Sequence, residues 1–228
     1  MSYHTLYNIK FVCKNSKNSA EKTNFVFEMC KQAPKKTITG VYGGSFNPIH
    51  LGHTSMAREI VRQGLVDEMW LVVSPQNPLK DSGLWDDGFR LELARTAVRD
   101  VEAVEVSDVE FGLPKPNYMV NTLETLSAQF PDREFVLVIG QDNWDCFHRW
   151  YKWEDILQRY RLMVLPRQTG EPCDDARRNE VCGRVTFVDT PLINISSTWI
   201  RSQIIDNSQY KGEGLDSKVW EMIREKML

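Results

Sequence analysis

The chain has 228 residues, of which 42% are apolar and 26% charged, and its formal net charge is −3. This composition is typical of a globular protein with a substantial core and argues against disorder. The acidic balance gives no electrostatic case for a nucleic-acid partner. No run approaches the ~20 apolar residues of a membrane span, and no signal-peptide pattern begins the chain. We therefore expect a cytoplasmic protein without a membrane partner.

Residues 1–36 differ in composition from the rest. They hold seven lysines against two glutamates and mix Asn and Ser with short apolar clusters. We expect a poorly ordered N-terminal extension, or one that follows from a start codon assigned too early, because Met29 would begin a chain that soon reaches the first strand. A targeting segment is the alternative, although the arginines of a mitochondrial presequence are missing. Residues 37–228 are expected to form a single domain that includes the C-terminal helices.

From Thr37 onward the hydrophobic pattern alternates between strand and helix. Helical spacing of apolar residues predicts helices within 56–61, 89–97 and 118–130, another from Ser197, and a last one over 219–227. Short apolar runs predict strands over 38–42, 69–74, 104–106, 134–139, 161–165 and 185–188. This succession predicts an α/β fold with a Rossmann-like, doubly wound parallel sheet. Ligands of such sheets bind beyond the carboxyl ends of the strands, at the switch point.

Residues 43–53, GGSFNPIHLGH, follow the first predicted strand and open a helix. The paired glycines, Gly43 and Gly44, let the backbone approach a ligand closely. The helix start presents free N–H groups and the positive end of its dipole to an anion. His50 and His53 are three residues apart on one helical face, and Gly52 between them leaves room for the ligand. The segment predicts a grip for a triphosphate.

A second anion site is predicted at residues 195–201, ISSTWIR. Two hydroxyl residues, Ser197 and Thr198, open a helix, and Arg201 follows one turn later. An ordinary helix cap followed by a surface arginine is the alternative. Two anion-binding segments, one early and one late in the chain, would together form a pocket for a triphosphate.

These motifs resemble those of a known family. The first is identified as the G-x-F-[DN]-P-x-H-x-G-H signature of the nucleotidyltransferase superfamily, and the second resembles I-S-[SA]-[ST]-x-[IV]-R of nucleotide adenylyltransferases. The segment G-x-D-x(7)-W over 140–150 is similar to that of the nicotinic acid mononucleotide adenylyltransferases. Residues 38–228 resemble the bacterial enzymes over nearly their full length. The resemblance implies that ATP and nicotinic acid mononucleotide react to give deamido-NAD and pyrophosphate.

The resemblance also implies roles for individual residues. Magnesium is expected to arrive with ATP, without dedicated protein ligands and without a tightly bound cofactor. The expected catalytic residues are His50, His53 and Arg201. ATP is expected to contact Gly43, Gly44, Ser45, Phe46, His50, Gly52, His53, Gly140, Asp142, Ser197, Thr198 and Arg201. The mononucleotide is expected to contact Asn47, Lys80, Met119, Thr122, Trp150 and Tyr151.

Several alternatives stay open at this point. Lys80 fits a phosphate contact or an exposed loop lysine, and Arg90 a substrate contact or a helix-face salt bridge. Met119 stands where relatives carry a hydroxyl residue that helps to recognise the nicotinate carboxylate, which leaves the preference for acid or amide open. Phosphopantetheine adenylyltransferase, a cytidylyltransferase and a non-catalytic nucleotide-binding module are the competing functions. The oligomeric state is also left open.

Overall fold

The computed structural model describes residues 35–75, 84–166, 183–188 and 195–227. By its internal contacts the chain divides into two units, Met1–Lys35 and Lys36–Leu228. The expectations for the N-terminal extension and for Lys80 fall outside the described residues and stay predictions. All that follows concerns the second unit.

A six-stranded parallel sheet forms the centre of this unit, with the strand order β3-β2-β1-β4-β5-β6. This confirms the predicted doubly wound α/β fold, and each strand lies where the apolar runs predict it. The order reverses between β1 and β4, so the carboxyl ends of these two neighbours flank the switch point. The strands are β1 (Thr37–Gly44), β2 (Glu68–Val73), β3 (Val104–Ser107), β4 (Arg133–Gly140), β5 (Arg161–Leu165) and β6 (Val185–Phe187).

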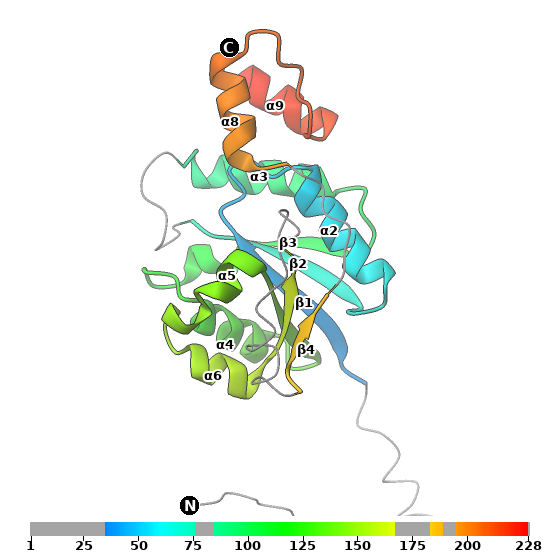
Figure 1. Cartoon of the computed structure of the whole chain (residues 1–228), viewed down its shortest axis with the longest axis vertical. Coiled ribbons are helices and arrows are strands. Elements are labelled where there is room, and N and C mark those ends of the chain that lie inside the picture. The colour runs from blue at the N-terminus through cyan, green and yellow to red at the C-terminus, as the bar shows by residue number, and fades with distance from the viewer. Residues whose placement is uncertain (1–34, 76–83, 167–182, 189–194, 228) are drawn as a thin grey trace, which may run out of the picture. The chain divides into compact units, whose positions relative to one another are not determined.

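Helices cover both faces of the sheet (Figure 1). On one side lie α2 (Leu51–Arg62) and α3 (Asp87–Val98), and on the other α4 (Met119–Gln129), α5 (Gln141–Asp145) and α6 (Trp153–Arg159). The chain ends with α8 (Ser197–Asp206) and α9 (Ser217–Met227). A salt bridge of 3.0 Å from Arg99 to Asp216 ties α9 to the end of α3.

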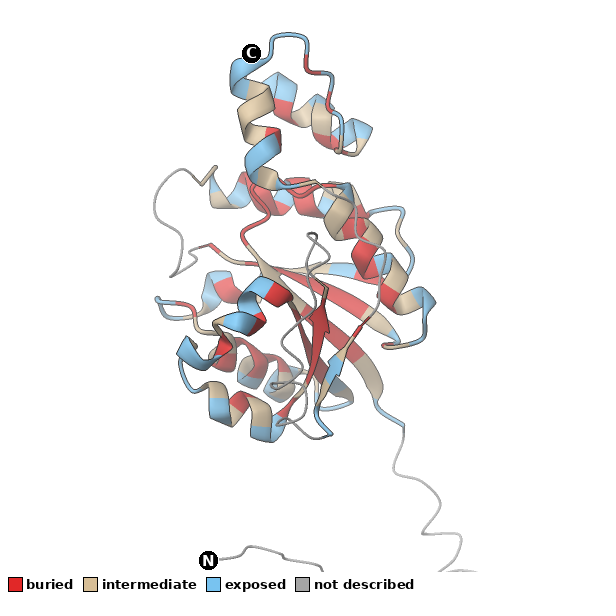
Figure 2. Cartoon of the chain, in the orientation of Figure 1, coloured by how far each residue is buried: buried red, intermediate tan, exposed pale blue. Residues whose placement is uncertain are grey.

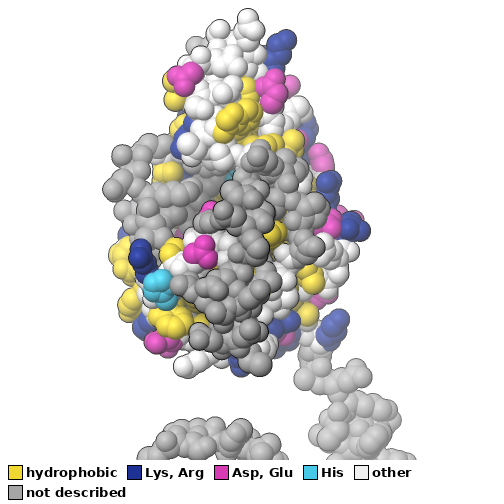
Figure 3. All heavy atoms as spheres, in the orientation of Figure 1, with side chains coloured by type: hydrophobic (Ala, Val, Ile, Leu, Met, Phe, Trp, Pro, Cys, Tyr) yellow, Lys and Arg dark blue, Asp and Glu magenta, His cyan; other side chains and the backbone are white. Residues whose placement is uncertain are grey.

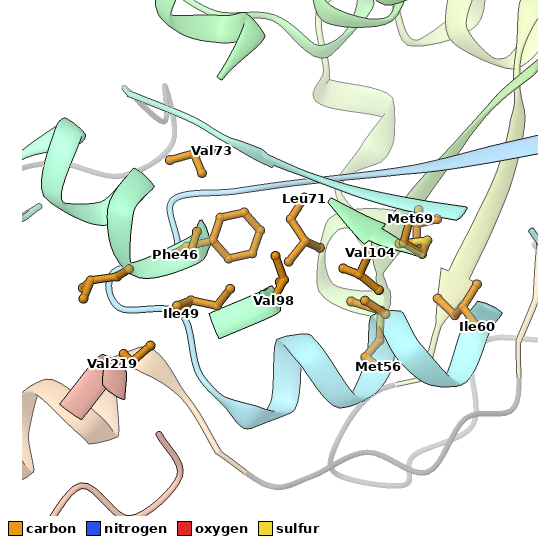
Figure 4. Close-up of a cluster of buried hydrophobic side chains, with 14 of the residues drawn as sticks. Phe46, Ile49, Met56, Ile60, Met69, Leu71, Val73, Val98, Val104 and Val219 are labelled. Atoms are coloured by element: carbon orange, nitrogen blue, oxygen red, sulfur yellow. The ribbon is translucent and has the colours of Figure 1, made fainter. Parts of the chain in front are cut away.

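The core follows from the two-residue period of the buried strands. Alternate residues of β2 point to opposite faces, so this strand contributes to two apolar clusters. Strands β2 and β4 are buried along most of their length (Figure 2). In Figure 4, Leu71 and Val104 of the sheet meet Met56 and Ile60 of α2. On the other face Trp70 and Val72 pack with Leu123 and Leu126 of α4.

The hydrophobic pattern of the sequence did not predict four short helical segments of the described chain: α5, α6, η1 (Val109–Gly112) and η2 (Phe147–Arg149). Each has seven residues or fewer, too few to establish a helical period. The N-cap residue of α4 is Tyr118, and its side chain makes no capping hydrogen bond. The neighbouring Asn117 is buried and donates its side-chain amide to the Glu110 carbonyl at 2.9 Å.

The surface of the described part is mixed in character. In the view of Figure 3, acidic and basic side chains are interspersed over the coloured surface. None of the helices that the structure describes is both long and apolar enough to cross a bilayer.

Candidate active site

The turn after β1 is the centre of the site, and the two glycines that end β1 lie close to neighbouring side chains. A Cβ atom on Gly43 would lie 2.5 Å from the Met119 methyl group of α4, and one on Gly44 would lie 3.0–3.2 Å from the Phe46 ring. Phe46 itself adopts a positive φ of 42°, a conformation that is rare for residues with a side chain. Its ring is almost wholly buried. The turn is therefore shaped by packing beneath it, with Phe46 as its anchor rather than an exposed ligand contact.

His50 and His53 stand together where the turn enters α2. Their rings are stacked, with centroids 3.7 Å apart and planes inclined by 26°. The His50 backbone N–H donates to Nδ1 of His53 at 3.2 Å. In the neutral His53 ring the proton is therefore on Nε2, which is a donor.

His50 is the more enclosed of the two histidines. It is 7% exposed, and its Nδ1 atom is buried without a hydrogen-bond partner among the described residues. Burial lowers the pKa of His50 to about 4, because an apolar environment disfavours the charged form. At neutral pH the site thus holds an uncharged imidazole that can donate one hydrogen bond.

A buried arginine fixes the turn against the end of β2. Arg90 of α3 is fully buried, and its guanidinium donates to the Ser45 carbonyl, to the Ser74 carbonyl at 2.9 Å and to the Pro75 carbonyl at 3.3 Å. Asp87 accepts from the same group at 2.7 Å. Arg90 therefore fixes the conformation of the loops. The salt bridge that the sequence offered as one alternative is present, to Asp87, but most of the hydrogen bonds of Arg90 go to backbone carbonyls.

The late motif lies directly against the early one. Ser197 donates to the Pro48 carbonyl at 2.9 Å, and Arg201 donates to the Asn47 carbonyl at 2.7 Å and to the Thr198 hydroxyl at 3.3 Å. Ser196 is the N-cap of α8 and accepts from the Trp199 N–H at 3.1 Å. Segments about 150 residues apart in sequence are thus joined by hydrogen bonds, with Thr198 exposed and Arg201 half-buried.

Asn47 takes part in this joint through its side chain as well. It is buried, and its carboxamide oxygen accepts from the Trp85 backbone N–H at 3.0 Å. This links the turn to the residues before α3 and indicates a structural role.

Across the switch point, Gly140 ends β4 and Asp142 lies exposed in the first turn of α5. A Cβ atom on Gly140 would have nothing within 4 Å. This glycine therefore borders open space, which suits close approach of a ligand, and Asp142 offers an acceptor beside it.

A pocket of about 160 Å³ opens beside the glycine turn. Of the residues expected to bind nucleotide, Gly43, Gly44, Met119, Trp150 and Tyr151 line it. The rings of Tyr118 and Tyr151 lie 4.6 Å apart on its wall. Six lining residues were missed by the sequence reasoning: Ser74, Glu110, Asn117, Tyr118, Asn143 and Arg149. The only signal for most of them was adjacency to a predicted strand end or to the aromatic segment.

A buried carboxyl group forms part of the pocket wall. Glu110 accepts from the Ser74 hydroxyl at 2.6 Å and from the Thr122 hydroxyl at 2.8 Å. Burial raises the pKa of Glu110, while these two hydrogen bonds oppose the rise. Thr122 is fully buried behind Glu110 and does not line the pocket, so the structure does not bring it to the ligand surface.

The described residues contain no group of three or more His, Cys, Asp or Glu side chains that could hold a metal ion. The groups that do converge, namely imidazoles, hydroxyls, a guanidinium and helix N–H groups, are those that bind anions. A parallel sheet with two such grips beside its switch point defines a nucleotide-binding α/β protein of the nucleotidyltransferase class.

Comparison with known proteins agrees with this class and narrows it. The family model "Cytidylyltransferase-like" matches residues 41–203. A protein of Bacteroides thetaiotaomicron named probable nicotinate-nucleotide adenylyltransferase is 44% identical over 191 residues, which cover 83% of this chain and 92% of that protein. One of the same name from Flavobacterium psychrophilum is 40% identical, covering 81% of this chain and 94% of the relative. The chain therefore belongs to the cytidylyltransferase-like family, and within it to the nicotinate-nucleotide adenylyltransferases.

Solved structures share the fold. The Plasmodium falciparum nicotinic acid mononucleotide adenylyltransferase complexed with NaAD superimposes with a TM-score of 0.70 at 16% identity, covering 84% of this chain and 97% of that one. The structure of a putative nicotinate-nucleotide adenylyltransferase from Vibrio parahaemolyticus gives a TM-score of 0.61 at 24% identity, covering 82% and 99%.

Proposed function

We propose that this protein transfers the adenylyl group of ATP to nicotinic acid mononucleotide, giving deamido-NAD and pyrophosphate in NAD biosynthesis. One observation carries the proposal beyond family membership. An aromatic-walled pocket of about 160 Å³ opens directly beside the glycine turn that leads to the two histidines. A pyridine ring suits such a wall, because aromatic rings stack favourably on one another. The cytoplasmic location expected from the sequence belongs to this proposal.

In this proposal ATP lies across the switch point. Its ribose approaches Gly140, where the open side of the glycine leaves room, and its hydroxyls donate to Asp142. Its phosphates lie between the start of α2 and the start of α8, where the exposed Thr198 and the half-buried Arg201 belong to one helical turn. Both helices contribute the positive ends of their dipoles to this position.

The chemical step needs no covalent enzyme intermediate. A phosphate oxygen of the mononucleotide attacks the α-phosphorus of ATP, a new P–O bond forms, and the bond to the β-phosphate oxygen breaks. Negative charge moves to the departing pyrophosphate. His53 donates from Nε2 and His50 from its neutral ring to the phosphates. Arg201 and Thr198 hold the pyrophosphate together with the backbone N–H groups that open α8, that of Ser197 included. The protein thus contributes positioning and charge stabilisation.

We also propose that magnesium enters as part of the ATP substrate. The converging side chains are donors and cations, which match phosphate oxygens better than they match a divalent cation. The ion would therefore be held by phosphate oxygens and water.

The proposal is tested by following pyrophosphate release with Mg²⁺ and a panel of substrates. ATP with nicotinic acid mononucleotide should be turned over, and mass spectrometry should identify deamido-NAD as the product. CTP in place of ATP, or phosphopantetheine in place of the mononucleotide, should give little turnover. Turnover with phosphopantetheine alone would overturn the acceptor assignment. Nucleotide binding without turnover of any pair would indicate a non-catalytic binding module.

A further inference from the structure

Arg149 is a charged residue of the pocket that the proposed reaction has not yet used. It ends the short helix η2, directly before Trp150, and it is the only lysine or arginine among the described residues that line the pocket. Within the described part of the chain its guanidinium makes no ion pair, in contrast to Arg133, Arg159 and Arg161. Arg149 therefore offers an uncommitted, planar set of donors at the pocket wall.

The pocket also holds one carboxyl group. Glu110 is the only acidic residue among the described lining residues, and it is 2% exposed. The hydroxyls of Ser74 and Thr122 donate to its two oxygens, and these hydrogen bonds oppose the rise in the pKa of Glu110 that burial causes. No salt bridge joins Glu110 to Arg149, so each charge is left to interact with what lies in the pocket.

This pair of charges matches the ring of the proposed acceptor. In nicotinic acid mononucleotide the ring nitrogen bonds the ribose and is a positively charged pyridinium, while the ring carries a carboxylate. The amide analogue has the same cation but no carboxylate. We propose that Arg149 binds the nicotinate carboxylate and determines the preference for the acid, while Glu110 faces the pyridinium cation. This inference rests on the proposed function.

Two neighbouring groups are poorly placed to bind the carboxylate. The thioether of Met119 has no hydrogen-bond donor, and its methyl group packs toward Gly43. The Trp150 backbone N–H already donates to the Phe147 carbonyl at 2.9 Å. A guanidinium can bond both oxygens of a carboxylate at once, whereas toward an amide it would face the NH₂ group with no acceptor to offer. Arg149 thus accounts for recognition of the acid despite the methionine at position 119.

The test compares kcat/KM for the acid and amide mononucleotides in Arg149→Gln, Arg149→Lys and Arg161→Gln. Arg161 is the control, since this arginine of β5 pairs with Glu134 and does not line the pocket. Losing hydrogen bonds to a charged group should lower kcat/KM for the acid by about 10-fold to 100-fold, mainly through KM. The amide should change little, Arg149→Lys should be intermediate, and Arg161→Gln should match the unmodified protein.

A second variant separates the two charges. Glu110→Gln should weaken binding of acid and amide alike, because both carry the pyridinium cation, and calorimetric titration of each mononucleotide measures this without turnover. Equal losses for acid and amide in Arg149→Gln would leave the acid-to-amide ratio of kcat/KM unchanged. This result would show that Arg149 does not recognise the carboxylate and would overturn the inference. Failure of the unmodified protein to use either mononucleotide would instead contradict the proposed function.

Discussion

His50 shows at the scale of one residue how burial sets the chemistry of the site. Its imidazole is 7% exposed and its pKa is lowered to about 4. The side chain is therefore a neutral donor across the physiological range, whereas an exposed histidine with a pKa near 6.5 would change charge there. We therefore expect His50 to act as a neutral hydrogen-bond donor, without being protonated first.

This lowered pKa predicts how stability depends on pH. Between pH 6.5 and 4 the unfolded chain binds a proton at His50 that the folded protein excludes, so the free energy of unfolding should fall as the pH falls through that window. The expected loss from this residue between pH 7 and pH 5 is about 2 kcal/mol. Denaturant unfolding at both pH values should show this loss in the natural protein, and His50→Gln should show about 2 kcal/mol less. Parallel pH dependence in the two proteins would contradict the assignment.

At the scale of the element, α3 serves the site through Arg90. Its guanidinium holds the carbonyls of Ser45, Ser74 and Pro75, which belong to the loops after β1 and β2. The two loops that border the pocket and the histidine turn are thereby fixed to one helix. A buried charge in such a network is costly to disrupt, because the carbonyls that remain lose their donors.

We therefore expect Arg90→Ala to lower the free energy of unfolding by about 3–5 kcal/mol. Arg95→Ala is the matched control on the same helix, since Arg95 is 53% exposed and pairs with Asp108 at 2.8 Å. A surface pair of this kind contributes at most about 1 kcal/mol. Equilibrium denaturation of the two variants measures the difference, and equal losses would contradict the structural role of Arg90.

The strands and the long helices of this fold were predictable from the sequence, and the short helices were not. The strands appear in the sequence because runs such as 135–139 are buried on both faces, and the long helices appear because their apolar residues repeat at helical spacing. The short helices α5 and α6 lie in a segment dense in aromatic residues, where burial comes from many directions and no period emerges.

At the scale of the whole molecule, the site residues that lie in one continuous segment were predictable from the sequence. Those that only folding brings together were not. The turn with His50 and His53 is one continuous segment, so its residues can be recognised together as a motif. Glu110 and Ser74 are 36 residues apart in sequence and meet only through the sheet. Arg149 resembles any surface arginine until folding places it at the pocket wall. Long-range contacts of this kind leave no periodic mark in a sequence.

The claim that joins these scales is that the paired histidines at the switch point drive adenylyl transfer. It is tested most directly by the single-turnover rate of deamido-NAD formation from ATP and nicotinic acid mononucleotide in the natural protein, in His53→Ala and in His148→Ala. His148 is exposed and lies outside the pocket lining. Loss of one preorganised donor should slow His53→Ala by about 10²-fold to 10³-fold, while His148→Ala keeps the natural rate. A natural protein that forms no dinucleotide, or a His53→Ala variant as fast as the natural protein, would contradict the account.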